Sequence, residues 1–175
     1  MEILAIDPGE KESGWLIFQP SGRKIRDAGV DSNQMVRDNL IVWRGLGGIA
    51  VVIEDIQSYG MPVGRSTFET VRWMGRFEEI MGSFGVMWLP RRAVKLHLCG
   101  SARAKDSNVR QALLDKFRDG QGGGKTPQIG TKKQPGPLYG ISGHLWSALA
   151  LAVTYTETKL GVSCEPCVAA ARLGD

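Results

Sequence analysis

The chain has 175 residues, 42% of them hydrophobic, which is enough length and apolar material for one sizeable core. Its formal net charge is +4, and Lys and Arg cluster at Arg91–Lys95, Arg103–Lys105 and Lys125–Lys133. Such clusters favour a polyanionic partner, although each one taken alone is also what a solvated surface looks like. No apolar run reaches the ~18 residues of a membrane span, so a membrane protein is excluded.

Three cysteines, Cys99, Cys164 and Cys167, are odd in number, and the chain shows no secretory signal. No disulfide framework is therefore implied, and a reducing, cytoplasmic environment is expected. Cys164 and Cys167 have the spacing of half a zinc site, but structural zinc normally takes a second pair of ligands. We interpret them as incidental cysteines of the tail.

The first 30 residues predict three strands joined by short turns. An apolar run, Met1–Ile6, ends at Asp7-Pro8-Gly9, where proline and glycine stop the strand and begin a turn. Gly14–Phe18 and Arg23–Val30 are two further strands on either side of turn residues 19–22. Because their connections are so short, these strands are expected to form an antiparallel meander.

The next segments predict helices that alternate with buried strands. Apolar residues at helical spacing over Asn33–Trp43 give way to glycines, and Ile49–Ile53 follows as a continuous apolar strand. Ser66–Met81 has the pattern of a long amphipathic helix, and Val86–Leu89 that of another buried strand, stopped by Pro90. A strand buried on both faces and preceded by a helix is expected to lie parallel to the first strand.

The second half of the chain predicts three helices and one long loop. The helices are expected at Val94–Cys99, at Asn108–Phe117 with Asp106 or Ser107 as its N-cap, and at Ser142–Leu160. Residues 120–137 are rich in Gly, Pro, Lys and Gln and have almost no apolar content, which predicts a mobile loop.

The order of these elements predicts an α/β fold of the ribonuclease-H-like type. Three antiparallel strands, a helix, and two strands with helical crossovers give a five-stranded mixed sheet flanked by helices. We expect a single domain of this type over residues 1–160 and a tail over residues 161–175.

Two carboxylates stand at the ends of strands that this fold makes neighbours. Asp7 ends the first strand, and Glu54 directly follows five apolar residues. Two such carboxylates can hold Mg²⁺, and metal held there can activate water against a phosphodiester. Asp7 alone is also a common turn residue. An acid at the mouth of a buried strand, however, costs free energy unless it is paired or binds metal. Asp55 should point to the opposite face and be structural.

Several short segments, in order, resemble the RuvC family of Holliday junction resolvases, its phage-type members above all. They are Ile6-Asp7-Pro8-Gly9, Ser13-Gly14-Trp15, Val52-Ile53-Glu54, Gly100-Ser101-Ala102 leading through Lys105 into the 109–114 helix, and Ser147–Ala152. The resemblance covers residues 1–157. It implies a nuclease domain in a homodimeric, magnesium-dependent endonuclease, bacterial or phage-encoded, that nicks two opposed strands of a four-way DNA junction.

The resemblance also implies roles for particular residues. Asp7 and Glu54 fall on the family's first two metal-binding acids, with Mg²⁺ as the cofactor and Mn²⁺ as a substitute. The resemblance implies two kinds of DNA-binding residue. Tyr59 would stack against junction bases, and three basic side chains lie near phosphate-contacting positions: Arg76, Lys95 and Lys105. For Tyr59, an ordinary loop tyrosine is the alternative interpretation.

The last helix departs from the family's pattern. Many relatives carry two acids, or a histidine and an acid, three residues apart at its start, where this chain has His144 and Ser147. Ser147 is a poor magnesium ligand, whereas His144 can bind a metal or position the attacking water; a helix-start histidine bonded to backbone is its alternative. Three explanations stay open: a two-carboxylate site assisted by His144, which we favour, a contribution from Asp106, or a weakened site.

The sequence thus predicts a metal-dependent endonuclease that resolves four-way junctions, with Asp7, Glu54 and His144 as the catalytic and metal-binding residues. The alternative is a junction-binding protein with weakened or no catalysis. A sugar-kinase or actin-type ATPase ranks last, because 175 residues leave little room for its second subdomain. We expect a homodimer, since two symmetric cuts need two sites, with its interface on the exposed part of the 66–81 helix, carrying Phe68, Trp73 and Phe77.

Overall fold

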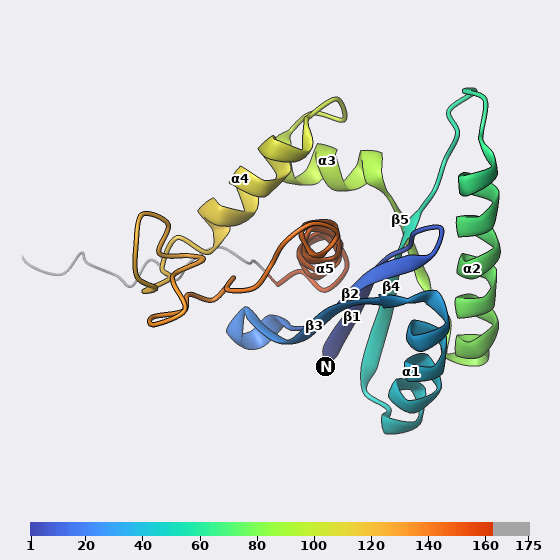
Figure 1. Cartoon of the computed structure of the whole chain (residues 1–175), viewed down its shortest axis with the longest axis horizontal. Helices are drawn as coiled ribbons and strands as arrows, with labels where there is room; N and C mark the ends of the chain where they lie inside the picture. The colour runs from blue at the N-terminus through green and yellow to red at the C-terminus, as the bar shows by residue number, and fades with distance from the viewer. Residues whose placement is uncertain (163–175) are drawn as a thin grey trace, which may run out of the picture.

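A computed structural model of the chain describes residues 1–162 (Figure 1). The interpretation of Cys164 and Cys167 therefore lies outside the described residues. Five strands form one sheet in the order β3-β2-β1-β4-β5. Their bounds are β1 Glu2–Asp7, β2 Glu12–Gln19, β3 Lys24–Ser32, β4 Ile49–Asp55 and β5 Met87–Pro90.

The strand directions agree with the directions predicted from the sequence. β1, β2 and β3 pair antiparallel, whereas β4 runs parallel to both β1 and β5. The helices are α1 Asn33–Leu46, α2 Arg65–Met81, α3 Arg91–Cys99, α4 Asp106–Lys116 and α5 Leu145–Lys159, with short 3-10 turns at Pro20–Gly22 and Gly82–Phe84. None of the helices within residues 1–162 has both the length and the apolar character that crossing a membrane requires.

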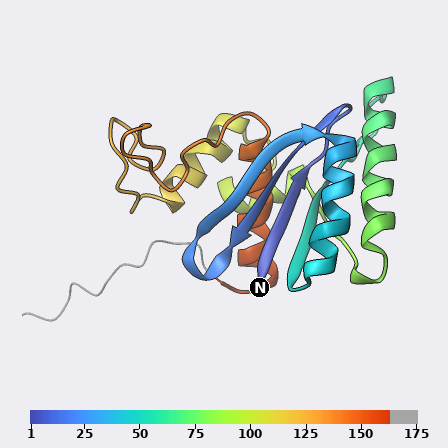
Figure 2. The same ribbon diagram turned by 60° about the horizontal axis from the view of Figure 1, so that its bottom comes forward.

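The sheet separates two layers of helices, and each layer closes its own hydrophobic cluster (Figures 1 and 2). On the α5 face, side chains of the strands pack against α3, α4 and α5; those from the sheet are Ile3, Ala5, Leu16, Phe18, Val52 and Leu89. On the α2 face, strand side chains pack against α1 and α2; these are Leu4, Ile6, Trp15, Val51 and Ile53. Alternation along the central strands thus assigns their buried apolar residues to one layer or the other.

The turn after β1 is held by a buried polar network. Ser13 Oγ donates to Asn33 Oδ1 over 2.6 Å, and Asn33 Nδ2 donates to the carbonyl of Gly9 over 2.9 Å. A Cβ added to Gly9 would lie 2.4 Å from the carbonyl oxygen of Glu12, so this position has room for glycine alone. The turn predicted after Asp7 is therefore tied to the start of α1.

α3 and α4 begin three and two residues earlier than the sequence indicated. α3 starts at Arg91, directly after Pro90, because a proline before the first turn is compatible with helix geometry. α4 starts at Asp106, and its N-cap is Lys105. The expected capping role of Asp106 is wrong: the Asn108 side chain accepts from the Lys105 N–H over 3.0 Å, while Asp106 pairs with cations of α3.

The segment 120–137 is a loop, as predicted, but it is folded onto itself. The Gly123 N–H donates to the Gln134 carbonyl over 2.8 Å, and the Gly136 N–H to the Ile129 carbonyl over 2.9 Å. A Cβ on Gly136 would lie 2.2 Å from the Pro127 carbonyl oxygen. Closely packed backbone, which glycine permits, replaces the apolar contacts whose absence led us to expect a mobile segment. In Figures 1 and 2 this loop lies apart from the sheet.

Candidate active site

Asp7 and Glu54 lie side by side at the carboxyl ends of the two central parallel strands. Ile6 of β1 is in register with Ile53 of β4, and each acid follows one residue later. By alternation, Asp7 shares the side of Ala5, and Glu54 that of Val52, so both carboxylates face α5. Each residue is only 7% exposed. The predicted pairing of these two acids is therefore present, on the side of the sheet that α3 and α5 cover.

Arg91, at the first position of α3, is bonded to Glu54. Its Nη1 donates to Glu54 Oε1 and Oε2 over 3.1 and 3.2 Å, and to Ser147 Oγ of α5 over 3.1 Å. Ser147 therefore reaches the site indirectly, as an acceptor for this guanidinium. From the sequence, Arg91 was assigned only to a basic cluster, although its position directly after the strand that neighbours β4 is a signal for it.

His144 stands at the start of α5 and is bonded to Asp7. Its Nδ1–H donates to Asp7 Oδ2 over 2.9 Å, and its side chain is 52% exposed. The side chain is thus bonded to Asp7 and not, as in the alternative interpretation, to backbone; in the tautomer that donates from Nδ1, Nε2 is the acceptor of the ring. Gly14, opposite Asp7 on β2, makes room for it, because a Cβ there would lie 2.6 Å from His144 Cβ.

Asp106 extends the network outward from Arg91. Its Oδ1 accepts from Arg91 Nη2 and from Lys95 Nζ, each over 3.1 Å. Burial opposes ionisation of Asp106, but the bonds and charges of Lys95 and Arg91 outweigh it and lower the pKa of this carboxyl. Asp106 thus stays an anion. It is bonded to Arg91, which is also bonded to Glu54, and to Lys95.

Glu54 is the electrostatically perturbed member of the pair. Burial, followed by the hydrogen bond and the charge of Asp7, raises its pKa from the ordinary 4.5 to about 8, against the opposing effect of Arg91. A perturbed acid in such a position is typical of functional sites. Ionising both carboxylates at neutral pH calls for a further positive charge close to them.

The donor set fits one divalent cation held by Asp7 and Glu54. Their oxygens are hard ligands, and Mg²⁺ is commonly bound by one or two carboxylates, waters and substrate phosphate. Within residues 1–162, no group of three His, Cys, Asp or Glu side chains is placed to hold a metal ion together. His144, the third ligand expected from the sequence, is instead joined to Asp7 through Nδ1.

No family model matches the sequence, and no curated protein matches it. Two solved structures are similar over most of their length. RuvC of Thermus thermophilus superposes with a TM-score of 0.65 at 18% identity, covering 93% of this chain and 98% of that one. The same protein in complex with a Holliday junction substrate gives 0.60 at 17% identity, covering 93% and 97%. The chain has the RuvC fold. The ribonuclease-H-like architecture and the structural resemblance predicted from the sequence are thereby confirmed.

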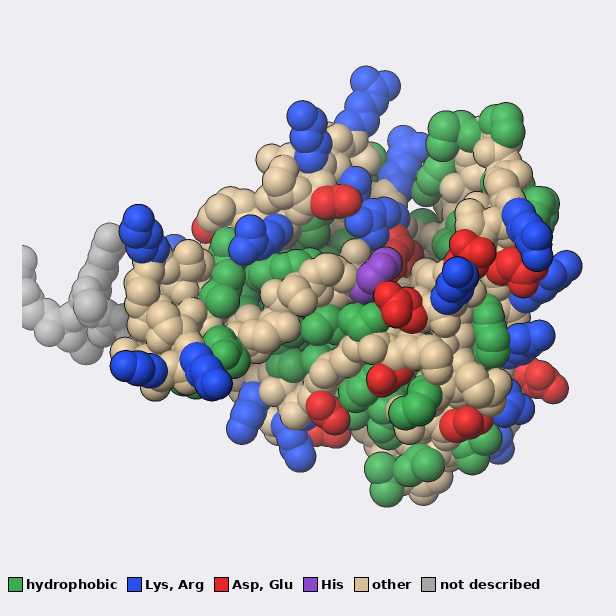
Figure 3. Space-filling view, in the orientation of Figure 1, with side chains coloured by type: hydrophobic (Ala, Val, Ile, Leu, Met, Phe, Trp, Pro, Cys, Tyr) green, Lys and Arg blue, Asp and Glu red, His purple; other side chains and the backbone are tan. Residues whose placement is uncertain are grey.

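Of the predicted DNA contacts, Tyr59 and Lys95 line one groove of this RuvC fold, and Lys105 lies at the start of α4. Tyr59 is 53% exposed and lines, with Lys95, a groove whose other basic residues are Arg91, Arg92 and Arg103. The Arg92 guanidinium lies 6.0 Å from the centre of the Tyr59 ring. Lys105 is exposed at the N-cap of α4. Figure 3 shows Lys and Arg gathered over α3, α4 and the connection between them.

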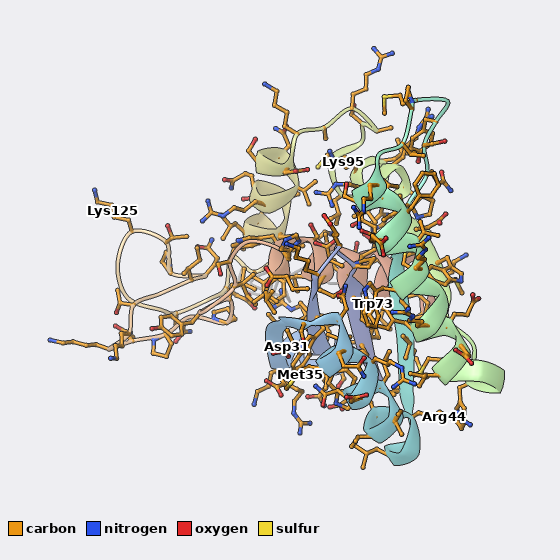
Figure 4. The ribbon with its side chains drawn as sticks, turned by 45° about the vertical axis from the view of Figure 1, so that its right-hand side comes forward. Asp31, Met35, Arg44, Trp73, Lys95 and Lys125 are labelled. Carbon is orange, nitrogen blue, oxygen red and sulfur yellow. The ribbon has the colours of Figure 1, made fainter. Side chains whose placement is uncertain are left out.

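Arg76 does not belong to this basic surface. It lies on α2, which covers the opposite face of the sheet, with its guanidinium 4.3 Å from the centre of the Trp73 ring. Figure 4 shows Trp73 well away from Lys95. The sequence could not separate them, because the positions of α2 and α3 around the sheet are set by packing.

The expected dimer surface on α2 also needs correction. Phe77 is fully buried and Trp73 is partly buried in the cluster of the α2 face. Of the three aromatic residues named from the sequence, only Phe68 is exposed, at 56%, and the neighbouring Val71 is exposed at 46%. The exposed apolar part of α2 is therefore its N-terminal half.

Proposed function

We propose that this protein is a divalent-metal-dependent endonuclease that resolves four-way DNA junctions by paired nicking. The observation that carries the proposal is the buried pair Asp7 and Glu54 in a RuvC fold, where Arg91 bonds Glu54 and also lines the basic groove. Burying two acids side by side without function would only reduce stability. The basic groove and the similarity to a structure solved with a Holliday junction support branched DNA as the substrate.

In this proposal the two carboxylates hold Mg²⁺, for which Mn²⁺ can substitute. When bound, the cation supplies charge that stabilises the pentacovalent phosphate and lowers the pKa of the attacking water. Asp7 and Glu54 fix its position because both end strands of the central sheet. No covalent bond between the protein and DNA is formed.

His144 accepts the proton that the attacking water loses in this reaction. Its Nδ1–H is committed to Asp7, which fixes the ring's orientation and leaves Nε2 to accept a proton from the attacking water. The role is that of a general base oriented by a carboxylate, and the exposure of the ring lets the proton pass to solvent.

The basic groove holds the phosphate backbone. Lys95 in the groove and the exposed Lys105 at the start of α4 neutralise phosphates, and Tyr59 offers an exposed ring against which a base can stack. Shape selectivity comes from presenting two such grooves in fixed relation, so the proposal includes a homodimer that joins through the exposed half of α2. Light scattering with and without junction DNA tests this part, and a monomer at micromolar concentration in both cases would contradict it.

A junction-binding protein without catalysis is the second candidate. Two observations favour it. No third acid stands beside Asp7 and Glu54 among residues 1–162, and Arg91 donates to both carboxylate oxygens of Glu54.

A cleavage assay separates the two candidates. Synthetic four-way junction, linear duplex and flap substrates are incubated with the protein and Mg²⁺ or Mn²⁺. Resolvase activity predicts symmetric nicks in the junction that depend on the metal and disappear in Asp7→Asn. Junction binding without nicks in either metal would select the second candidate.

A further inference from the structure

Arg91 is placed where a cation is needed by the carboxylate pair. Its Nη1 lies between both oxygens of Glu54 and the hydroxyl of Ser147, and its Nη2 is held by Asp106. The guanidinium is therefore anchored from β4, α5 and α4 at once. Its side chain is nevertheless 42% exposed, so it can leave Glu54 without opening the hydrophobic core.

The charges around the site explain why such a cation is present. Asp7 and Glu54 lie side by side, and Asp106 reaches the same guanidinium from α4. Arg91 and Lys95 are the two described cations of α3 that are bonded to Glu54 or Asp106. Of these two, Arg91 reaches Glu54, whereas Lys95, one helical turn further on α3, contacts Asp106. The lone pairs that Glu54 would offer a metal ion thus point at a guanidinium.

We propose that Arg91 is a built-in counter-cation that competes with the divalent metal for Glu54, so that metal binding requires this side chain to move away. The inference rests on the proposed metal site at Asp7 and Glu54. It predicts weak metal binding by the DNA-free protein. It also assigns Arg91 a positioning role, because the guanidinium holds Glu54 in place when no metal is bound.

The test is a Mn²⁺ titration of the full-length, DNA-free protein, in which electron paramagnetic resonance measures the Mn²⁺ that stays free in solution. Arg91→Gln is expected to tighten Mn²⁺ binding about tenfold or more, since a unit charge in direct contact with the ligand is removed. Arg91→Met keeps the aliphatic stem of the side chain and provides a second variant should the first fail to fold. Thermal unfolding of each variant verifies that it is folded.

Lys95→Gln is the matched control. It removes the same charge from the same helix, but from a side chain whose ion pair is with Asp106. A purely long-range effect would tighten Mn²⁺ binding equally in both variants, whereas direct competition predicts a change of less than about threefold for Lys95→Gln.

Glu54→Gln distinguishes failure of this inference from failure of the proposed metal site. If Glu54→Gln binds Mn²⁺ as the wild type does, the assignment of the metal site is wrong, and the proposed competition by Arg91 is rejected as well. If Glu54→Gln no longer binds Mn²⁺ while Arg91→Gln and Arg91→Met bind no more tightly than Lys95→Gln, the metal site stands and the role of Arg91 is overturned.

Discussion

The two faces of the sheet share the same strands, but they differ in the residues at the carboxyl ends of these strands. Along β4, Val52 faces α5 and leads to Glu54, whereas Ile53 faces α2 and leads to Asp55. Glu54 is buried beside a second acid, while Asp55 is half-buried and accepts a bond from Gln57 Nε2 over 2.7 Å. The α2 face therefore follows the ordinary rules of a core with a solvated rim, and the α5 face departs from them at the acid pair, where chemistry is proposed.

The largest effect is expected where the faces differ most. Asp7→Asn and Glu54→Gln should each reduce metal-dependent junction cutting by about a hundredfold or more, because each removes a charged metal ligand. Asp55→Asn, one residue along but on the opposite face, should leave the rate within about twofold of the wild type. Cutting rates on a labelled four-way junction measure both, and an equal reduction in Asp55→Asn would remove the distinction between the faces.

The α2 face should instead respond in stability. Phe77→Ala removes a fully buried ring and should lower the free energy of unfolding by about 3–5 kcal/mol, as measured by urea denaturation. Phe68→Ala, on the exposed part of the same helix, should change it by less than about 0.5 kcal/mol in the monomer. Similar values for the two variants would mean that α2 does not pack as described.

The pH dependence of stability should reveal the cost of burying Glu54. Because its pKa is raised from 4.5 to about 8, the folded chain binds this proton more tightly than the unfolded chain. Stability in a chelating buffer should therefore fall as the pH rises through this window, by an amount on the order of a few kcal/mol. Glu54→Gln should lack this contribution, so its stability relative to the wild type should increase from pH 5 to pH 8. A constant difference across the window would contradict the assignment.

The smallest effect is expected from the basic side chains. Lys95→Ala and Lys105→Ala should each weaken junction binding and reduce its salt dependence by about one unit of log–log slope for each phosphate that the variant no longer neutralises. Arg76→Ala, which removes a cation from α2, should leave the slope unchanged. Fluorescence anisotropy at several salt concentrations measures the slope for each variant. An unchanged slope in the Lys95 and Lys105 double variant would mean that these two residues are solvated and contact no phosphate.

The sequence was most informative where the signal was local. Turn residues 7–9 and 19–22 delimit the strands of the meander, and the short connections predict their antiparallel pairing. The neighbouring positions of Asp7 and Glu54 follow from strand order alone, because parallel neighbours bring their carboxyl ends to the same edge. The turns and the strands depend on residues close in the chain, whose conformational preferences act before any tertiary contact forms, whereas the pairing of β1 with β4 is a long-range contact.

The sequence was least informative where partners come from distant segments. Arg91 is 37 residues from Glu54 and 56 from Ser147, so its bonds depend on how α3 and α5 cross the sheet. The same holds for the separation of Arg76 from Lys95, and for the burial of Phe77 where an interface was expected. Helix periodicity reports which residues share a face, but it does not report what that face meets.

The sequence by itself predicted the fold class, the antiparallel pairing of the first three strands and the two candidate acids, since these follow from periodicity, turn chemistry and the unfavourable burial of charge. Tertiary structure alone decided which side chains bond to the two acids. Gly14 admits His144 to Asp7 because a side chain at that position would meet His144 Cβ at 2.6 Å. Arg91 reaches Glu54 because α3 begins at the residue after the end of β5, the strand beside β4. Both contacts are made by packing between elements far apart in the chain, a constraint that no local pattern encodes.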